Sequence, residues 1–333
     1  MELDELIDRD FRGCISIKQR GRRLFQQAYG YANLADKIPN TMETKFATAS
    51  AGKVFVAVAI LKLIENGKLH FDDMIGHLLD FNLHAIDPGI TIEQLLTHTS
   101  GIPDYFDERI MEDYDALWEN YPNYKIRASS DLLPLFLDKP MMYPKGERFQ
   151  YNNTGYVVLG LIIEKITHMP FDLFLQESVF SVCGMDSTGY YELDRLPEKC
   201  ANSYIFDRER NVYYTNIYSV DVKGTGAGGA FTTVGNIERF WDALLQNRLL
   251  SAEMTNQMLS RQSGTDQDGY YGYGVWLKKE EHNGCAPYFQ GCDPGVSFIS
   301  IYKPNEELLI TMISNFGDNV WKMTKKISRA LFP

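Results

Sequence analysis

The longest apolar stretch of the chain runs from Val54 to Ile64, where ten of eleven residues are hydrophobic and Lys62 is the exception. A helix with this pattern has no polar face, so we predict that it is buried on nearly all sides. Gly67 follows it as a stop, because glycine readily adopts the left-handed conformation that ends many helices. The pattern therefore predicts a helix at the centre of the core.

Shorter segments with alternating apolar and polar residues lie near both ends of the chain, as expected of strands. We predict strands over residues 14–19 and 23–31 around a turn at Gly21, and over 271–278, 286–290, 296–302 and 308–314. Short helices are predicted over residues 2–10 and 320–331. The middle of the chain is predicted to be mostly helical.

Strands from both termini around a helical centre indicate an α/β (α+β) fold, with one mainly antiparallel sheet flanked by helices. We expect a discontinuous sheet domain, residues 1–74 plus 226–333, and a mainly helical insertion, residues 75–225. An active site is expected between these two parts.

Composition narrows the function. The 333 residues carry 44 acidic and 33 basic side chains, for a net charge of −11 and no basic cluster. Nucleic acids and anionic membrane surfaces are therefore not expected partners, and no apolar stretch is long enough for a membrane span. Five scattered cysteines indicate neither a disulfide framework nor a zinc knuckle. The acidic N-terminus does not resemble a signal peptide, so we expect a cytoplasmic location, unless a leader has been removed.

Ser50 and Lys53 stand directly before the buried helix. Three positions apart on a helix, their side chains share a face and can touch. Burial lowers the pKa of a lysine, and a neutral lysine can take the hydroxyl proton of a serine and make it a nucleophile. In the first helical turn, free N–H groups would stabilise developing negative charge on Ser50. The alternative is a capping serine beside a lysine that extends to solvent.

Two short motifs occur more than once, and context selects one copy of each. A second S-x-x-K pair, Ser300 and Lys303, falls in a predicted strand, where residues three apart point to opposite faces. Tyr-x-Asn occurs four times. Only the copy at Tyr151–Asn153 lies between a Pro-Gly-containing turn and an amphipathic helix.

In this order, the motifs resemble the serine β-lactamase and penicillin-binding-protein superfamily, in its class C-like branch. Residues 46–53 resemble the family's nucleophile block, residues 95–103 the loop that follows its first helices, and residues 144–160 its Tyr-x-Asn block. Residues 184–188 and 226–233 resemble later landmarks. The resemblance covers most of the chain. It implies a β-lactamase/transpeptidase-like fold and a serine hydrolase related to DD-peptidases and esterases.

The resemblance also implies a role for each matching residue. Ser50 would be the acylated nucleophile, Lys53 its proton acceptor and Tyr151 a proton shuttle. Asn153 would hydrogen-bond Lys53 or the substrate amide. No metal or organic cofactor is implied.

The third family motif, Lys-Thr-Gly or His-x-Gly, is altered here to Phe289, Gln290 and Gly291, followed by Cys292. We assign the three motif residues to substrate binding, although Gln290, adjacent to Phe289 on a strand, faces the other side. The backbone N–H groups of Ser50 and Cys292 would form the oxyanion hole. Since Phe289 replaces the cation, recognition of a substrate carboxylate is expected to be lost.

Other signals favour simpler interpretations. Residues 224–229 satisfy the dinucleotide pattern G-x-G-x-x-G, but they follow a polar segment and precede the helix, so we predict a glycine turn. His70, His77 and His84 recur every seven residues without the spacing of a zinc site. His98 is expected to hydrogen-bond to backbone and shape its loop.

We therefore expect a serine hydrolase that acts through an acyl-enzyme on a small-molecule or peptide substrate with an amide or ester group, such as a β-lactam, a D-amino-acid peptide or a small ester. The alternative is a catalytically weak, penicillin-binding-protein-like module that binds a peptide or cell-wall fragment. An NAD-linked oxidoreductase would rest on the glycine run alone. The sequence leaves the oligomeric state open.

Overall fold

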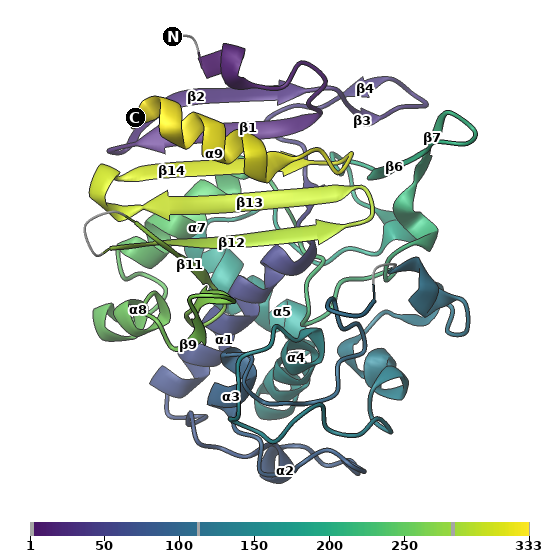
Figure 1. Cartoon of the computed structure of the whole chain (residues 1–333), viewed down its shortest axis with the longest axis vertical. Helices are drawn as coiled ribbons and strands as arrows, with labels where there is room; N and C mark the ends of the chain where they lie inside the picture. Colours follow the sequence, from purple (N-terminus) through teal and green to yellow (C-terminus); the bar gives the residue numbers. More distant parts are fainter. Residues whose placement is uncertain (1–2, 112–113, 281–283, 333) are drawn as a thin grey trace.

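The computed structural model describes residues 3–111, 114–280 and 284–332. Its largest element is an eight-stranded antiparallel sheet with the strand order β2-β1-β14-β13-β12-β11-β10-β9 (Figure 1). The strands are β1 (Gly13–Gln19), β2 (Arg22–Tyr29), β9 (Ser263–Thr265), β10 (Gly269–Tyr271), β11 (Trp276–Lys279), β12 (Cys285–Asp293), β13 (Val296–Lys303) and β14 (Leu308–Ser314). Both ends of the chain thus build one sheet, which confirms the predicted fold class.

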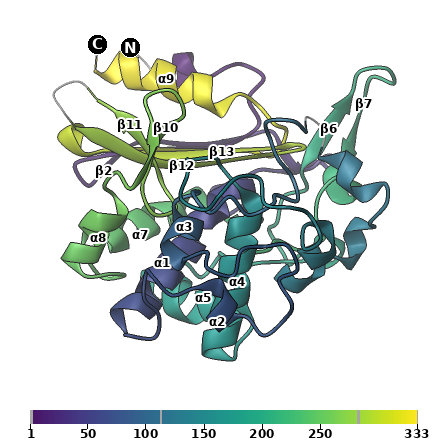
Figure 2. The same ribbon diagram turned by 60° about the horizontal axis from the view of Figure 1, so that its bottom comes forward.

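Helices cover both faces of this sheet. They are α1 (Lys53–Glu65), α2 (Ile75–Leu78), α3 (Ile92–Leu96), α4 (Asn153–Thr167), α5 (Phe171–Leu175), α6 (Ser181–Cys183), α7 (Val234–Leu245), α8 (Ala252–Met258) and α9 (Val320–Leu331). Figure 2 shows α9 on one face and the other labelled helices on the opposite side. Because α9 and α7 both pack on β14, that strand is buried along its whole length, which explains its mostly apolar sequence.

Some local predictions are wrong. The strand predicted over 271–278 is two strands, β10 and β11, separated by a turn at Gly274, whose φ is +74°. Of the helix predicted over 2–10, only a 3-10 turn, Leu3–Leu6, is formed; residue 2 lies outside the described residues. Two-stranded pairs not predicted are β3 (Tyr31–Asn33) with β4 (Ile38–Pro39), β5 (Phe46–Ala47) with β8 (Phe231–Thr232), and β6 (Tyr204–Asp207) with β7 (Val212–Thr215). The division into a sheet domain and an insertion stays a prediction.

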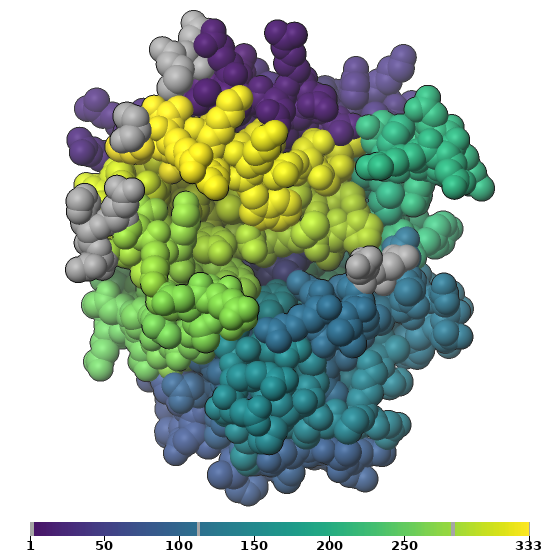
Figure 3. Space-filling view, in the orientation of Figure 1, coloured from purple at the N-terminus to yellow at the C-terminus, as the bar shows by residue number. Residues whose placement is uncertain are grey.

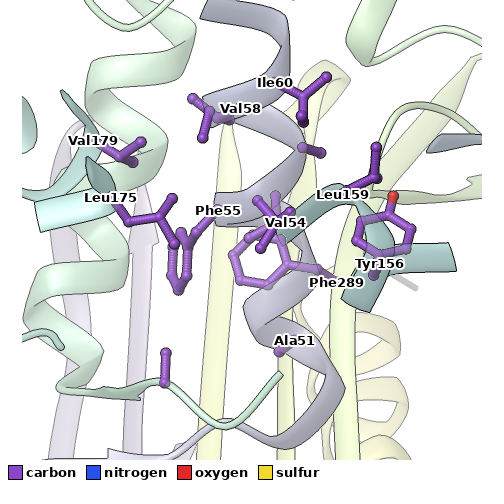
Figure 4. Packing of buried hydrophobic residues seen from close by; sticks show 14 of the residues in the cluster. Ala51, Val54, Phe55, Val58, Ile60, Tyr156, Leu159, Leu175, Val179 and Phe289 are labelled. Carbon is purple, nitrogen blue, oxygen red and sulfur yellow. The ribbon is translucent and has the colours of Figure 1, made fainter. Parts of the chain in front are cut away.

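Helix α1 runs through the middle of the core, as its apolar sequence predicted (Figure 4). Its residues from Lys53 to Leu61 are all buried. The Phe55 ring meets those of Phe180 and Phe240 edge-on, each at 5.1 Å between centroids. The start of this helix is therefore held from several sides, which fixes any side chain placed there.

The sheet meets this core through Phe289 on β12. Phe289 is buried, and its ring stacks on Trp241 of α7 at 5.4 Å and on Phe298 of β13 at 5.8 Å between centroids. Aromatic pairs of this kind bury large areas and dominate core energetics. Phe289 is therefore a structural contact between the sheet and the helices.

We predict that Phe289→Ala lowers the free energy of unfolding by about 3–5 kcal/mol, since it leaves a cavity between the rings of Trp241, Phe298 and Phe240. The control is Leu24→Ala at an exposed position, which should change the free energy of unfolding by less than about 0.5 kcal/mol. Chemical denaturation followed by fluorescence measures both. Equal losses in the two variants would contradict this packing.

Candidate active site

Ser50 lies in a 3-10 turn, Ala49–Gly52, that leads directly into α1. The sequence predicted the first turn of the helix itself, but the helix begins only after this turn. Ala49 has a φ of +48°, a left-handed conformation that is strained for a residue other than glycine. The Thr48 hydroxyl donates to the Ala230 carbonyl at 2.8 Å and holds the entry to the turn. Ser50 thus stands on a sharply bent, anchored segment.

The Lys53 side chain is buried and fully hydrogen-bonded. Its Nζ donates to Ser50 Oγ at 2.9 Å, to Asn153 Oδ1 at 2.8 Å and to the Ala227 carbonyl at 2.6 Å. The predicted Ser–Lys contact is present, and the alternative of a lysine that extends to solvent is wrong. Three elements distant in sequence thus meet at one ammonium group.

Burial lowers the pKa of Lys53 to about 8, while the carboxylates of Glu108 and Asp104 act in the opposite direction. A lysine with this pKa is partly neutral near pH 7, unlike a lysine in water. Once neutral, its Nζ can accept the hydroxyl proton of Ser50 across the existing hydrogen bond. The geometry and the lowered pKa together fit a general base.

Asn153 reaches Lys53 from the first residue of α4. The Asn152 side chain caps this helix by accepting from the Gly155 N–H at 2.8 Å. Asp104 accepts from the N–H groups of Asn153 and Thr154 at 2.9 and 3.0 Å. Sequence reasoning missed Asp104, because a contact across about fifty residues leaves no local pattern. The capped helix end fixes the position of the Asn153 side chain.

Tyr151 lies beside the Lys53–Ser50 pair. The Lys53 Nζ is 5.0 Å from the centre of its ring, which stacks on Trp276 at 5.8 Å. Burial raises the pKa of Tyr151 well above its ordinary value, and the hydrogen bond with Ser50 opposes this only in part. The phenol is therefore protonated at rest and is placed to donate a proton.

His98 contacts the segment of Tyr151 and Asn152, as predicted for a residue that shapes its loop by a hydrogen bond to backbone. Its φ is +58°, and its Nδ1 accepts from the Asn152 N–H at 3.2 Å. Its ring lies 4.6 Å from that of Tyr151. Burial places the pKa of His98 well below its ordinary value, so the imidazole is neutral. It positions Tyr151 and the start of α4.

Gly291 of β12 lies directly against the 3-10 turn that holds Ser50. A Cβ atom at this position would stand 2.1 Å from the Thr48 carbonyl oxygen and 2.8 Å from the Ser50 nitrogen. Only glycine permits this approach. The following residue, Cys292, lines the same pocket as Ser50. The assignment of the two backbone N–H groups, Ser50 and Cys292, to an oxyanion hole stays a prediction.

The structure corrects the assignment of Phe289 and Gln290 to substrate binding. Phe289 points into the core, and the Gln290 Oε1 accepts from Trp321 Nε1 of α9 at 2.8 Å on the opposite face of the sheet. Neither residue lines the pocket of Ser50. Alternation along the strand decides this, since successive side chains of β12 leave the sheet on opposite faces.

The glycine run at residues 224–229 packs on the same turn. A Cβ at Gly228 would lie 2.3 Å from the Ala49 carbonyl oxygen, and one at Gly226 would lie 2.1 Å from the Tyr156 carbonyl oxygen. Between them, Ala227 supplies the carbonyl that accepts from Lys53. The interpretation as a glycine turn is confirmed, and α7 begins only after it.

A pocket of about 630 Å³ opens above Ser50. Figure 3 shows a hollow between the yellow-green strands of the sheet and the blue and teal segments below it. Asn153 and Cys292 line the pocket with Ser50, and so do three carboxylates, Glu108, Asp221 and Asp293. The described residues include no group of three or more His, Cys, Asp or Glu side chains that could hold a metal ion. None of the described helices is long and apolar enough to cross a membrane.

Comparison with known proteins agrees with this geometry. The pattern of the Beta-lactamase family matches residues 8–330. The chain belongs to the β-lactamase family. Within it, the structure of a penicillin-binding protein from Bacillus halodurans is similar, with 38% identity, a TM-score of 0.94 and coverage of 99% of this chain and 100% of that one.

More distant relatives carry related names. Penicillin-binding protein 4* of Bacillus subtilis is 28% identical over 322 residues, which are 92% of this chain and 68% of that protein. A D-amino acid amidase from Ochrobactrum anthropi shares the fold, with a TM-score of 0.80, 20% identity and coverage of 99% of this chain and 96% of that one. The relatives of this chain in the β-lactamase family of serine hydrolases thus include penicillin-binding proteins, and the amidase shares their fold.

We predict that Gly291→Ala slows acylation of Ser50 by at least about 100-fold, because the added methyl group displaces the turn beside the oxyanion site. Gly235→Ala is the control, since its Cβ meets nothing closer than 3.8 Å. The rate of labelling by a fluorophosphonate, followed by intact-protein mass spectrometry, compares the two. Similar rates in folded protein would argue against the close approach.

The rate of fluorophosphonate labelling should also rise with pH. Only neutral Lys53 accepts a proton, so the rate should increase about tenfold per pH unit below a pKa of about 8 and level off above it. A rate profile from pH 6 to 10 gives the midpoint. A midpoint near 10, or no pH dependence, would exclude Lys53 as the base.

Proposed function

We propose that this chain is a serine hydrolase that forms an acyl-enzyme at Ser50 with an amide or ester substrate. One observation carries the proposal: the buried Lys53 Nζ lies 2.9 Å from Ser50 Oγ, and burial lowers the pKa of that lysine to about 8. A site that only binds a ligand has no need of a desolvated lysine against a serine hydroxyl.

In the proposed acylation, Ser50 Oγ attacks the substrate carbonyl carbon while its proton passes to neutral Lys53 Nζ. The carbonyl oxygen becomes an oxyanion held by the backbone N–H groups of Ser50 and Cys292. The bond to the leaving group then breaks, and the Tyr151 phenol donates the proton that the leaving amine or alkoxide needs. Tyr151 regains a proton from Lys53, which returns to the neutral state.

Deacylation follows the same route with water as the nucleophile. Water attacks the ester carbonyl, its proton passes to the Tyr151–Lys53 pair, and Ser50 Oγ leaves and takes a proton back. The products are a carboxylic acid and the free serine. Asn153 keeps Lys53 in place through both steps, since it accepts from Nζ at 2.8 Å.

The substrate class follows from the lining of the pocket. Among the described residues, no lysine, arginine or histidine lines it, and the third-motif cation is replaced by the buried Phe289. A substrate carboxylate, as in penicillins and D-Ala-D-Ala peptides, therefore lacks a cationic partner here. The shared fold with a D-amino acid amidase supports an amide substrate.

We predict that a fluorophosphonate adds its mass to the wild-type protein and not to Ser50→Ala, because Ser50 is the hydroxyl in hydrogen-bond contact with the buried Lys53. Ser130→Ala, which removes an exposed hydroxyl, should label like the wild type. A fluorescent penicillin should label more slowly, since its carboxylate has no cationic partner. Intact-protein mass spectrometry measures labelling of the wild type and both variants.

Labelling of Ser50→Ala would place the nucleophile elsewhere. If neither probe labelled folded wild-type protein, a non-catalytic binding module would be the better description.

A further inference from the structure

The pocket above Ser50 is lined by carboxylates from three separate segments. Glu108 stands at its exposed rim, and Asp221 and Asp293 are half-buried within it. The position of Ser50, the proposed nucleophile, in the lining already marks this pocket as a ligand site. The carboxylates therefore bear on which ligand it accepts.

Asp293 has the most direct position. It ends β12 two residues after Gly291, so both side-chain positions face the same side of the strand. The strand rise places its Cα about 7 Å beyond that of Gly291, which touches the Ser50 turn. Asp293 also directly follows Cys292, the proposed oxyanion donor. Ser50 and Asp293 line the same pocket, so a substrate held at Ser50 has the Asp293 carboxyl group within reach.

The Asp293 carboxyl group has no bonding partner within the protein: in the part of the chain that the structure describes, no hydrogen bond or ion pair involves it. Asp221 accepts from the Tyr114 hydroxyl at 2.8 Å and Glu108 from Asn153 Nδ2 at 3.4 Å. Both donors are neutral, so none of the three carboxyl groups forms an ion pair with a described residue.

The three groups instead repel one another. Burial, together with the charges of Asp221 and Glu108, raises the pKa of Asp293 to about 8 against the opposite effect of Lys53. Burial also raises the pKa of Asp221 to about 6. The Lys53 ammonium offsets this only in part, and its three donors bind other groups. A cation that enters the pocket would restore the charge balance and stabilise the ionised carboxylates.

We propose that the substrate carries a free α-ammonium group on its acyl side, bound by Asp293 and Asp221 with Glu108 at the rim. The chemical class is an amino-acid amide or ester, or a short peptide cleaved after its free N-terminal residue. This inference rests on the proposed function, since it names the substrate of the same site. It also explains why no lysine, arginine or histidine among the described residues lines the pocket: the charge to be recognised is positive.

Aromatic side chains complete the pocket. Tyr105, Phe106, Tyr114, Tyr191 and Phe231 line it beside the carboxylates. They provide apolar surface for the side chain of such an amino acid and faces on which an ammonium group is favourable. A hydrophobic amino-acid amide is therefore the matched probe.

The test measures binding without turnover, in Ser50→Ala protein. Isothermal titration calorimetry compares each enantiomer of phenylalaninamide with 3-phenylpropanamide, which differs only by lacking the amine. One enantiomer should bind about 10- to 100-fold more tightly than the neutral amide, as expected for a charge-assisted hydrogen bond. Asp293→Asn, and separately Asp221→Asn, should reduce this ratio about tenfold or more.

Asp186→Asn is the matched control, because it removes an exposed carboxylate that does not line this pocket and should leave the ratio unchanged. Equal binding of the two amides, binding of neither, or a ratio that survives both pocket substitutions would overturn the inference. Fluorophosphonate labelling of wild-type protein decides the proposed function separately. A missing label with a preserved amine preference would refute catalysis at Ser50 and leave the ammonium site standing.

Discussion

The site depends on the burial of one ammonium group at the start of the core helix. Lys53 is 2% exposed, and its three donors are satisfied by the Ser50 hydroxyl, the Asn153 amide oxygen and the Ala227 carbonyl. Removing an unpaired ammonium from water is costly, so these partners must be in place for the chain to fold around it. The same burial lowers the pKa of the lysine and makes it useful as a base. The burial of Lys53 thus both constrains the fold and suits this lysine to the proposed chemistry.

Glycine contacts bring the separate segments together at this point. Gly291 of β12 and Gly228 of the glycine turn both lie against the backbone around Ser50, so closely that neither position has room for a Cβ atom. The sheet and the glycine turn therefore approach Ser50 through backbone alone. This leaves the space above Ser50 for a substrate and places Asp293 beside it.

Much of this could be predicted from the sequence, because the signals were local. An apolar run of eleven residues predicted α1, and alternation near both ends predicted the strands that build the sheet. The spacing of Ser50 and Lys53 predicted their contact. The 3-10 turn at Ser50 was not predicted, because it depends on Ala230 and other segments that pack against it.

The errors have a common physical cause in tertiary packing. Phe289 matched a substrate-binding motif by position, but the rings of Trp241 and Phe298 draw its side chain into the core. Asp104, Asp221 and Asp293 carry no local pattern, since they meet only when distant segments pack together. The family resemblance pointed to Ser50 as the candidate nucleophile, whereas the carboxyl groups of the pocket became visible only in the fold.

The central claim, that Lys53 titrates as a general base, is tested most directly by NMR of the protein labelled with 15N and 13C at lysine. The signals of Lys53, assigned by their loss in Lys53→Met, should shift with a midpoint near pH 8. The surface lysines should titrate near pH 10.4, as free lysine does. A Lys53 midpoint at or above that of the surface lysines would contradict the account.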